Sequence, residues 1–393
     1  MNWMLFVLVA GAFQGLLLSI ALLRKNHKNE KANRWLAAFI FVFVALTIGE
    51  VLNRTVEYHN KSALLFLSDW MIFLLAPLMF MYIKEMTGER NEIGAKLLLH
   101  LIPSLFFLLL LLPIYFMPSS IKIKIAIDDL TPQKDILSNV LSLIIFTQMG
   151  IYILWGFAIL RRYSRRLREH YSDLGQRNLR WLHTILAINM ALWILSLLQI
   201  FTSSDVISVL NDLAFPIVVY VFGYLGLAQA DLEPVRAAIA EDVEVTIAAS
   251  KQNDTTPDRK PDESANRYVR SGLTAEKAAI LKQKLDILML NERPYLEDDL
   301  NLRELADRLE VFPHHLSQLL NEHYDQNFFD YINSYRAQEV KNMLSNPTQK
   351  DESILSIAFS CGFNSKATFN TFFKKQTGQT PRQFRADCES KKG

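Results

Sequence analysis

The sequence predicts an all-α protein with three parts: a seven-helix transmembrane bundle, a flexible linker and a C-terminal domain with two helix-turn-helix motifs. Three observations lead to this prediction. Hydrophobic residues make up 50% of the 393 residues and gather in long blocks before Gln229. A polar stretch with too few apolar residues to form a core follows. Beyond it, apolar residues recur at the spacing of amphipathic helices.

The N-terminal part contains seven apolar blocks of helical length. A helix needs about 20 apolar residues to cross the hydrocarbon core of a bilayer. Any one block is also compatible with a buried helix of a soluble protein, but seven in succession favour a membrane bundle. The blocks are Trp3–Leu23, Trp35–Leu52, Ala63–Ile83, Leu97–Met117, Leu137–Leu160, Trp181–Phe201 and Leu213–Leu227.

The charges that flank these blocks predict their orientation. Arg24 and Lys25 follow the first block and no cation precedes it, which indicates a retained helix and not a cleaved signal peptide. Lys and Arg are dense after the first, third and fifth blocks and sparse in the alternate loops. The positive-inside rule then predicts a multi-pass protein of the cytoplasmic (inner) membrane, with the N-terminus outside and the C-terminus in the cytoplasm. The arginine-rich loop 161–180 is interpreted as a topology signal that also contacts anionic lipid.

The predicted domains are a transmembrane domain at residues 1–229, a flexible cytoplasmic linker at 230–267 and a helical domain at 268–393. The linker includes Asp254–Pro261 among other polar residues. As a flexible coil it would have a mean span of roughly 30 Å. This length would allow the C-terminal domains of two copies to meet.

Near the C-terminus, residues 354–376 are predicted to form a helix, a tight turn and a second helix. Gly362 ends the first helix, because a residue without Cβ enters a left-handed turn at little steric cost. Asn364 or Ser365 caps the next helix, and phenylalanines recur along it from Phe369. Its remaining faces are polar, as expected for a helix that enters a DNA major groove. The alternative is a solvated helical hairpin with an aromatic core.

A related motif is predicted at residues 302–323. Its helices are Leu302–Leu309 and Pro313–His323, with Pro313 in the first turn of the second helix. Phe328–Leu344 is predicted to be a connecting helix of about 25 Å. Two reading helices joined in this way would reach successive major grooves, about 34 Å apart, on bent DNA.

The C-terminal motif resembles the AraC-type transcription regulators. The matching positions are Ile357, Ala358, Gly362, Phe363, Ser365, Phe369, Phe373, Lys374, Gly378, Thr380, Pro381 and Arg385. Shorter pieces resemble the sensor half of membrane-bound members of that family: Pro77 with Tyr82, His100–Pro103 and Asn178–Leu182. The resemblance implies a one-component transcription regulator that binds promoter DNA in response to a signal sensed by its membrane region.

The chain departs from the family pattern in its first motif. The turn Glu310–Phe312 lacks the glycine and the capping serine often found there. Acidic residues dominate the first half of the domain and basic residues the second. We therefore expect the second motif to supply more of the phosphate contact and a single domain to bind weakly, with pairing as a homodimer on DNA offsetting that weakness.

Candidate DNA-contacting residues are carried over only onto matched positions. Base reading is expected from the second helix of each motif, because Gln bonds an adenine edge, Lys a guanine edge and the Thr methyl group a thymine. For each residue the alternative is a solvated surface position or a phosphate contact. The set is His314, Ser317, Gln318, Lys366, Thr368 and Thr371, with Lys374, Lys375 and Arg382 added for DNA contact from the second half of the domain.

Polar residues inside the apolar blocks suggest a second site. Intramembrane carboxylates are costly and therefore point to function. The hypothesis is an outward-opening pocket for a small signal ligand, and the alternative is that the carboxylates simply meet interfacial water. The candidate residues are Gln14, Glu50, Asp69, Asn189 and Asp212.

No enzymatic activity, metal site or cofactor is expected. The chain contains no glycine-rich phosphate loop, GxSxG or HExxH motif. The adjacent His314 and His315 diverge on a helix, so a shared metal is not expected. The alternative functions are a membrane transporter or a membrane enzyme that carries a regulatory DNA-binding tail. The absence of a visible internal repeat speaks against transport. Expected partners are double-stranded promoter DNA, the lipid bilayer, a signal ligand or membrane partner, and a second copy of the chain.

Overall fold

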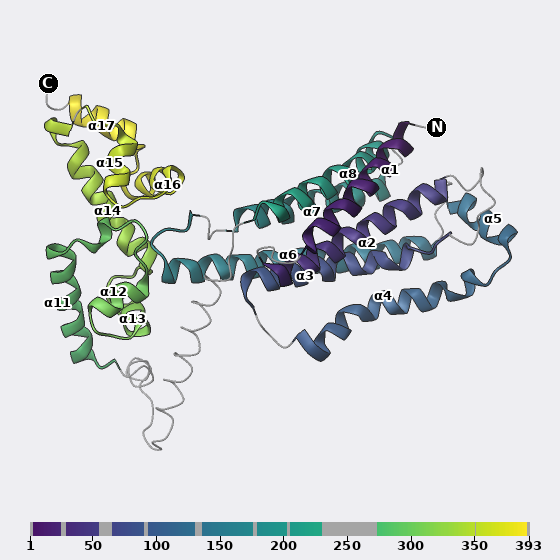
Figure 1. Ribbon diagram of the computed structural model, residues 1–393, viewed down its shortest axis with the longest axis horizontal. Helices are drawn as coiled ribbons and strands as arrows, with labels where there is room; N and C mark the ends of the chain where they lie inside the picture. The colour runs from purple at the N-terminus through teal and green to yellow at the C-terminus, as the bar shows by residue number, and fades with distance from the viewer. Residues whose placement is uncertain are drawn as a thin grey trace, which may run out of the picture. The chain divides into compact units, whose positions relative to one another are not determined.

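The computed structural model describes residues 3–24, 29–54, 65–89, 93–129, 136–175, 179–202, 205–229, 273–349 and 351–390 (Figure 1). The predicted linker at 230–267 lies outside them. The chain forms two compact units, one of Met1–Arg162 with Leu179–Glu233, the other of Tyr163–Asn178 with Pro234–Gly393. Each unit is described by itself. The predicted all-α class is confirmed: over the described ranges the elements are helical, apart from one isolated bridge between Tyr171 and Asn301.

Long helices make up the first unit, and each predicted apolar block overlaps one of them. The helices are α1 (Trp3–Leu22), α2 (Glu30–Arg54), α3 (Ile72–Thr87) with the preceding turn η3 (Asp69–Met71), α4 (Ile93–Tyr115), α5 (Ser119–Asp129), α6 (Ile136–His170), α7 (Arg180–Phe201) and α8 (Asp205–Leu227). Helix α5 lies in a stretch expected to be a loop. It escaped prediction because isoleucines alternate with lysines there and no long apolar run marks it.

Six helices of the described residues are long and apolar enough to cross a membrane, and Leu99–Tyr115 of α4 is a shorter apolar helix. Large apolar side chains point outward from several of them. Phe13 on α1, Phe106 on α4 and Leu154 on α6 are each more than 60% exposed. Exposed apolar surface of this extent is rare on soluble monomers. It has the character of a surface that faces lipid.

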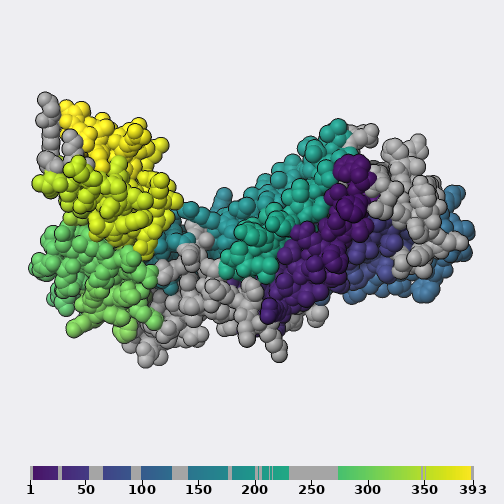
Figure 2. All heavy atoms as spheres, turned by 45° about the horizontal axis from the view of Figure 1, so that its top comes forward, coloured from purple at the N-terminus to yellow at the C-terminus, as the bar shows by residue number. Residues whose placement is uncertain are grey.

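A line of small residues packs α1 against its neighbours. Gly11, Gly15 and Ser19 recur every four residues and are buried, while α1 lies along α2 and α8 (Figures 1 and 2). A methyl group built at Gly15 would come within 2.6 Å of Val44 on α2 and 2.8 Å of Val219 on α8. The Ser19 hydroxyl donates to the Ala37 carbonyl at 3.0 Å. Small residues at this spacing let membrane helices approach closely.

Helix α14 (Phe328–Leu344) joins the two helix-turn-helix motifs of the C-terminal unit (Figure 1). The first motif is α12 (Leu302–Arg308) and α13 (Pro313–His323), preceded by α11 (Ala275–Asn291) and the turn η6 (Pro294–Leu296). The second is α15 (Ile354–Ser360) and α16 (Lys366–Thr377), flanked by the turn η7 (Pro347–Gln349) and helix α17 (Pro381–Ser390). The bounds of α13 and α14 are those predicted, because Pro313 and the capping Asn327 mark where these helices begin.

Each motif has its own core. Leucines of α11, α12 and α13 form the first, together with Phe328, Tyr331 and Ile332 of α14. Aromatic rings dominate the second: Phe363, Phe369, Phe373 and Phe384 follow one another at centroid distances of 5.3 to 5.6 Å. The phenylalanine spacing that predicts α16 is therefore the spacing of its buried face.

The turns of the two motifs differ in backbone conformation. In the second, Gly362 has a φ of +89°, which is the left-handed turn predicted there. In the first, Glu310 adopts a φ of +56° without being glycine. Phe312 occupies the N-cap of α13 and makes no side-chain capping hydrogen bond. Both features follow from the departures from the family pattern noted in the sequence.

Candidate nucleic-acid interface

Helix α16 presents most of the predicted contacts of the second motif. Its N-cap is Ser365, whose hydroxyl accepts from the Thr368 amide, and Gly378 ends the helix in the left-handed conformation. Phe369, Phe372 and Phe373 face the core. The polar face is left outward: Lys366, Thr371, Lys374 and Lys375 are exposed and Thr368 is half-buried.

The lysines of α16 differ in their surroundings. The Lys375 ammonium lies 3.3 Å from the Asp330 carboxylate of α14 and 5.8 Å from the Phe372 ring. Lys374 lies beside it in the last turn and is exposed. Arg382, at the start of α17, is also exposed. These three side chains place positive charge near the C-terminal end of α16.

The predicted residues of α13 are half-buried. Gln318 donates to the Glu322 carboxylate at 3.1 Å, and the Ser317 carbonyl accepts from Asn321 at 2.8 Å. The His314 ring stacks on Phe312 with a centroid distance of 5.6 Å. Burial, together with the neighbouring His315, lowers the pKa of His314 below its ordinary value. His314 is therefore an uncharged donor or acceptor at neutral pH.

Phe312 is an exposed residue that its sequence pattern does not mark as a DNA contact. It is 60% exposed at the start of α13 and carries the His314 ring on its face. An exposed aromatic ring beside a recognition helix offers apolar contact to a thymine methyl group. In the sequence, Phe312 stands out only because it occupies the position where the family often has a capping serine. That difference does not by itself indicate a contact with DNA.

A cavity of about 520 Å³ lies within the first unit. Glu50, Asp69 and Asn189, predicted as pocket residues, all line it, together with Asn211 and Ser196. Most of the wall is apolar, with the aromatic rings Phe39, Phe43, Phe107, Phe146 and Trp193. Gln14 is half-buried on α1 and is not one of the lining residues. The Asp212 side chain lies outside the described residues.

Comparison with known proteins identifies the C-terminal part. Residues 305–387 match a family described as a helix-turn-helix domain. An uncharacterised HTH-type transcriptional regulator of Staphylococcus aureus strain COL is 37% identical over 93 residues, which are 24% of this chain and 12% of that protein. The HTH-type transcriptional activator RhaS of Pectobacterium carotovorum is 32% identical over 94 residues, 24% of this chain and 33% of that protein.

A solved structure of a protein of unknown function from Listeria innocua is similar in sequence, with 29% identity over 28% of this chain and 96% of that chain, and superposes with a TM-score of 0.24. The matched part of the chain spans about an eighth of the length of the staphylococcal relative and a third of RhaS. The similarity to both relatives covers only 24% of this chain. The C-terminal unit of this chain therefore contains a helix-turn-helix domain of the AraC type.

Proposed function

We propose that this protein is a membrane-embedded one-component transcription regulator. Its C-terminal domain binds promoter DNA with α13 and α16, and its membrane helices sense a signal. The observation that carries the proposal is the presence, in one chain, of six helices suited to a bilayer and an AraC-type double helix-turn-helix domain. The loop charges support an orientation with the N-terminus outside and the C-terminus in the cytoplasm, where the DNA is.

The geometry of the C-terminal unit supports two-groove binding. Helix α14 has 17 residues and is therefore about 25 Å long, and it connects two motifs whose second helices carry polar, outward residues. Exposed Lys374 and Arg382 favour phosphate contact by the second motif. His314, Ser317 and Gln318 from α13, and Lys366, Thr368 and Thr371 from α16, are the proposed base readers. Two copies bound at a repeated site would raise the effective concentration of each domain at its half-site.

The cavity supports the sensor role. Its lining is mainly apolar and aromatic, with two carboxylates from Glu50 and Asp69. A small molecule with an apolar body and a positively charged or hydrogen-bond-donating group fits such a lining. Replacing Glu50 with Gln and Asp69 with Asn keeps the shape and removes the charge. Both variants should reduce the response to an apolar amine while leaving the response to its uncharged analogue unchanged.

The experiment that tests the DNA-binding role is genome-wide mapping of the tagged full-length protein in intact cells. The expected result is a small set of promoters that share a repeated sequence. Footprinting of one of them with the purified protein in nanodiscs should protect two segments one helical turn apart on one face of the duplex. Uniform, sequence-independent occupancy in cells together with no footprint would contradict the proposal.

A further inference from the structure

The end of helix α6 and the residues that follow it are part of the C-terminal unit. This piece, Tyr163–Asn178, precedes α11 in the chain, and α7 and α8 lie between the two. Tyr171, Ser172, Asp173 and Leu174 are buried. From the sequence, the loop 161–180 is predicted to be a topology and lipid-contact element. The structure adds a second contact, because the described part of Tyr163–Asn178 packs in the same compact unit as the helix-turn-helix domain.

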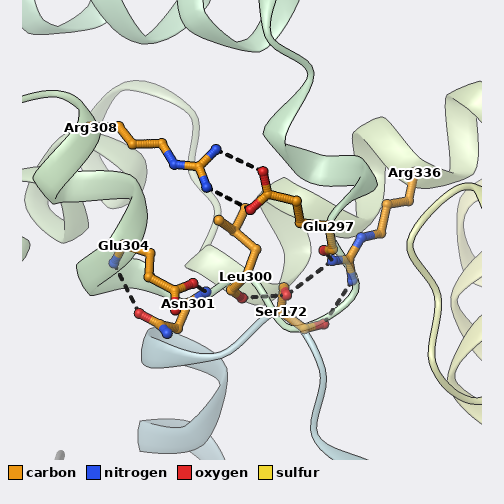
Figure 3. A network of polar contacts seen from close by, with 7 residues as sticks. All are labelled: Ser172, Glu297, Leu300, Asn301, Glu304, Arg308 and Arg336. Atoms are coloured by element: carbon orange, nitrogen blue, oxygen red, sulfur yellow. Dashed lines mark hydrogen bonds and ion pairs between the residues drawn. The ribbon is translucent and has the colours of Figure 1, made fainter.

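Ser172 makes the hydrogen bonds that join this piece to the helix-turn-helix domain. Its backbone amide and its hydroxyl both donate to the Leu300 carbonyl, at 3.3 and 2.5 Å. Its own carbonyl accepts from the Asn333 side chain at 2.9 Å. The neighbouring Tyr171 forms an antiparallel bridge with Asn301, which caps α12. One short segment therefore contacts both the entry to the first motif and the connecting helix α14 (Figure 3).

Arg336 of α14 lies at the centre of these contacts and is fully buried. Its guanidinium donates to the Ser172 hydroxyl at 3.1 Å and to the carbonyls of Tyr295 and Glu297 at 2.7 and 2.6 Å. The Glu297 carboxylate in turn pairs with Arg308 of α12 (Figure 3). Burial lowers the pKa of Arg336 to about 10, while Asp173 and Asp298 act in the opposite direction. The side chain therefore stays charged, and its loss of water is offset by these acceptors.

The same arginine also reaches the second motif. Its guanidinium lies 6.0 Å from the centroid of the Phe363 ring, directly after the Gly362 turn. Arg168 of α6 lies 5.2 Å from the Phe329 ring, and Phe329 packs edge-on against Phe372 of α16. The segment 168–174, named here the docking segment, thus contacts residues that support both motifs.

We propose that the docking segment is the element through which the membrane helices control DNA binding, and that the docked arrangement is the DNA-binding form. This rests on the function proposed above. Helix α6 runs without a break from apolar residues near Ile136 to His170, so the segment is a direct extension of a membrane helix. By contacting the entry of the first motif and α14 together, it holds the two recognition helices in one relative orientation. A pre-organised pair loses less freedom on binding two grooves.

A disulfide tests whether the segment is docked in the full chain. Tyr171→Cys and Asn301→Cys replace the bridged pair, whose Cα atoms in such a pairing lie about 5 Å apart, within disulfide reach. Cys388→Ser removes the partly exposed native thiol. A protease site is inserted at Asp254–Pro261. After oxidation in native membranes and cleavage, the double variant should run as one band without reductant and as two with it. Each single variant should give two bands, and two bands from the double variant would refute docking.

DNA affinity tests the consequence. Ser172→Ala and Asn333→Ala in the full chain, in nanodiscs, should each bind a mapped promoter about five- to tenfold more weakly, the effect of losing one or two net hydrogen bonds. Matched controls on α14 are Ser334→Ala, whose hydroxyl donates within its own helix, and exposed Asn342→Ala. Both controls should bind as the parent does, and the disulfide-locked chain should keep full affinity.

Two further outcomes would overturn either the docked state as the DNA-binding form or the proposed function itself. Unchanged or tighter binding by Ser172→Ala and Asn333→Ala, with the C-terminal fragment still protease-resistant, would overturn the docked state as the DNA-binding form. A parent chain that binds no promoter would overturn the proposed function and this inference with it. The disulfide result stays independent of DNA and therefore separates a wrong contact from a wrong function.

Discussion

Gly362 and Arg336 show how closely single residues are constrained in the C-terminal unit. Gly362 turns the chain between α15 and α16 in the left-handed conformation, and the buried guanidinium of Arg336 lies against that turn. A residue with a side chain at position 362 would have to displace the turn and the arginine together. Gly378 has the same sign of φ at the end of α16 but has open space around it. Comparing substitutions at the two glycines therefore separates the cost of the left-handed backbone from the cost of side-chain packing.

Gly362→Ala should destabilise the C-terminal unit far more than Gly378→Ala. A methyl group at position 362 would lie 2.5 Å from the Tyr295 carbonyl oxygen and 2.9 Å from Arg336 Nε. We expect a loss of roughly 3 kcal/mol or more there, against about 1 kcal/mol at position 378, where only the left-handed φ is unfavourable. Hydrogen exchange of α14 and α16 amides in the full chain measures both. Equal losses would contradict the packing argument.

Lys374→Ala should weaken DNA binding by a similar factor for all sequences and reduce the salt dependence by about one phosphate contact. The reason is that Lys374 is exposed at the end of α16, where its charge would contact a phosphate, and every DNA sequence has the same phosphates. Gln318→Ala should instead relax base preference at one position. Exposed Lys284→Ala on α11 is the charge-matched control. Titrations at several salt concentrations distinguish the three, and an unchanged salt slope for Lys374→Ala would remove it from the interface.

The two cysteines should differ in reactivity. Burial, with a smaller contribution from Glu339, raises the pKa of the Cys361 thiol to about 12, so almost none of it is thiolate at pH 8. Cys388 is partly exposed on α17. A maleimide should label Cys388 within minutes and Cys361 only after unfolding, as read by mass spectrometry of the two peptides. Rapid labelling of Cys361 in the folded chain would show that the second core opens easily.

At the scale of elements, the helices were predictable because their signals are local. Leucine and phenylalanine spacing marks the buried faces of α11, α13 and α16, and Thr274, Pro313 and Ser365 mark where they begin. The docking segment was not predictable. Ser172 acts through its hydroxyl and also through backbone atoms that every residue has, and its partners are 128 to 164 residues away. Helix α5 was missed because isoleucines alternate with lysines there and no long apolar run marks it.

The candidate site residues also divide into those whose position follows from local sequence spacing and those whose position depends on long-range packing. Matched positions placed Lys366, Thr371, Lys374 and Arg382 on the exposed surface, since a helix face follows from spacing alone. Glu50, Asp69 and Asn189 share one cavity, whereas Gln14 does not reach it. Which polar membrane residues face a common space depends on helix rotation, and rotation is decided by packing between helices far apart in sequence.

Gly15→Leu should disrupt the packing of α1. The added side chain would collide with Val44 and Val219 on two neighbouring helices, at a cost of about 2–3 kcal/mol by the usual effect of overpacking. Ala10→Leu places the same leucine side chain on the exposed face of α1 and should be tolerated. Thermal unfolding in mild detergent compares the two variants. Equal midpoints would show that α1 does not pack closely in the membrane.

At the scale of the whole molecule, the described residues present two different kinds of surface. Helices of the first unit expose large apolar side chains, whereas α13, α16 and α17 expose polar and basic ones. The proposed function needs both surroundings at once: lipid around the first unit and the DNA-containing compartment around the second. The orientation of the chain across the membrane is therefore the most direct test of the proposed function at this scale.

Fluorescent and phosphatase reporters should reveal that orientation. A green fluorescent protein fused after Gly393 should fluoresce and alkaline phosphatase at the same position should be inactive, because the C-terminus is proposed to lie in the cytoplasm. Phosphatase inserted after Asn60, in a stretch of sequence poor in lysine and arginine, should be active. The reverse pattern would place the helix-turn-helix domain away from DNA and would rule out its proposed role.

The contact between Ser172 and Arg336 also bears on how the polypeptide is made. Its two ends are separated by 164 positions, so the ribosome releases the first long before the second. By then α6 would already have entered the bilayer in the proposed topology. The last helices to be synthesised would then close around a piece of chain that is anchored in advance, and maturation of the gene-regulating end would finish at the membrane surface. A fragment that starts at α11 would contain every helix of both motifs and still lack one of its internal parts.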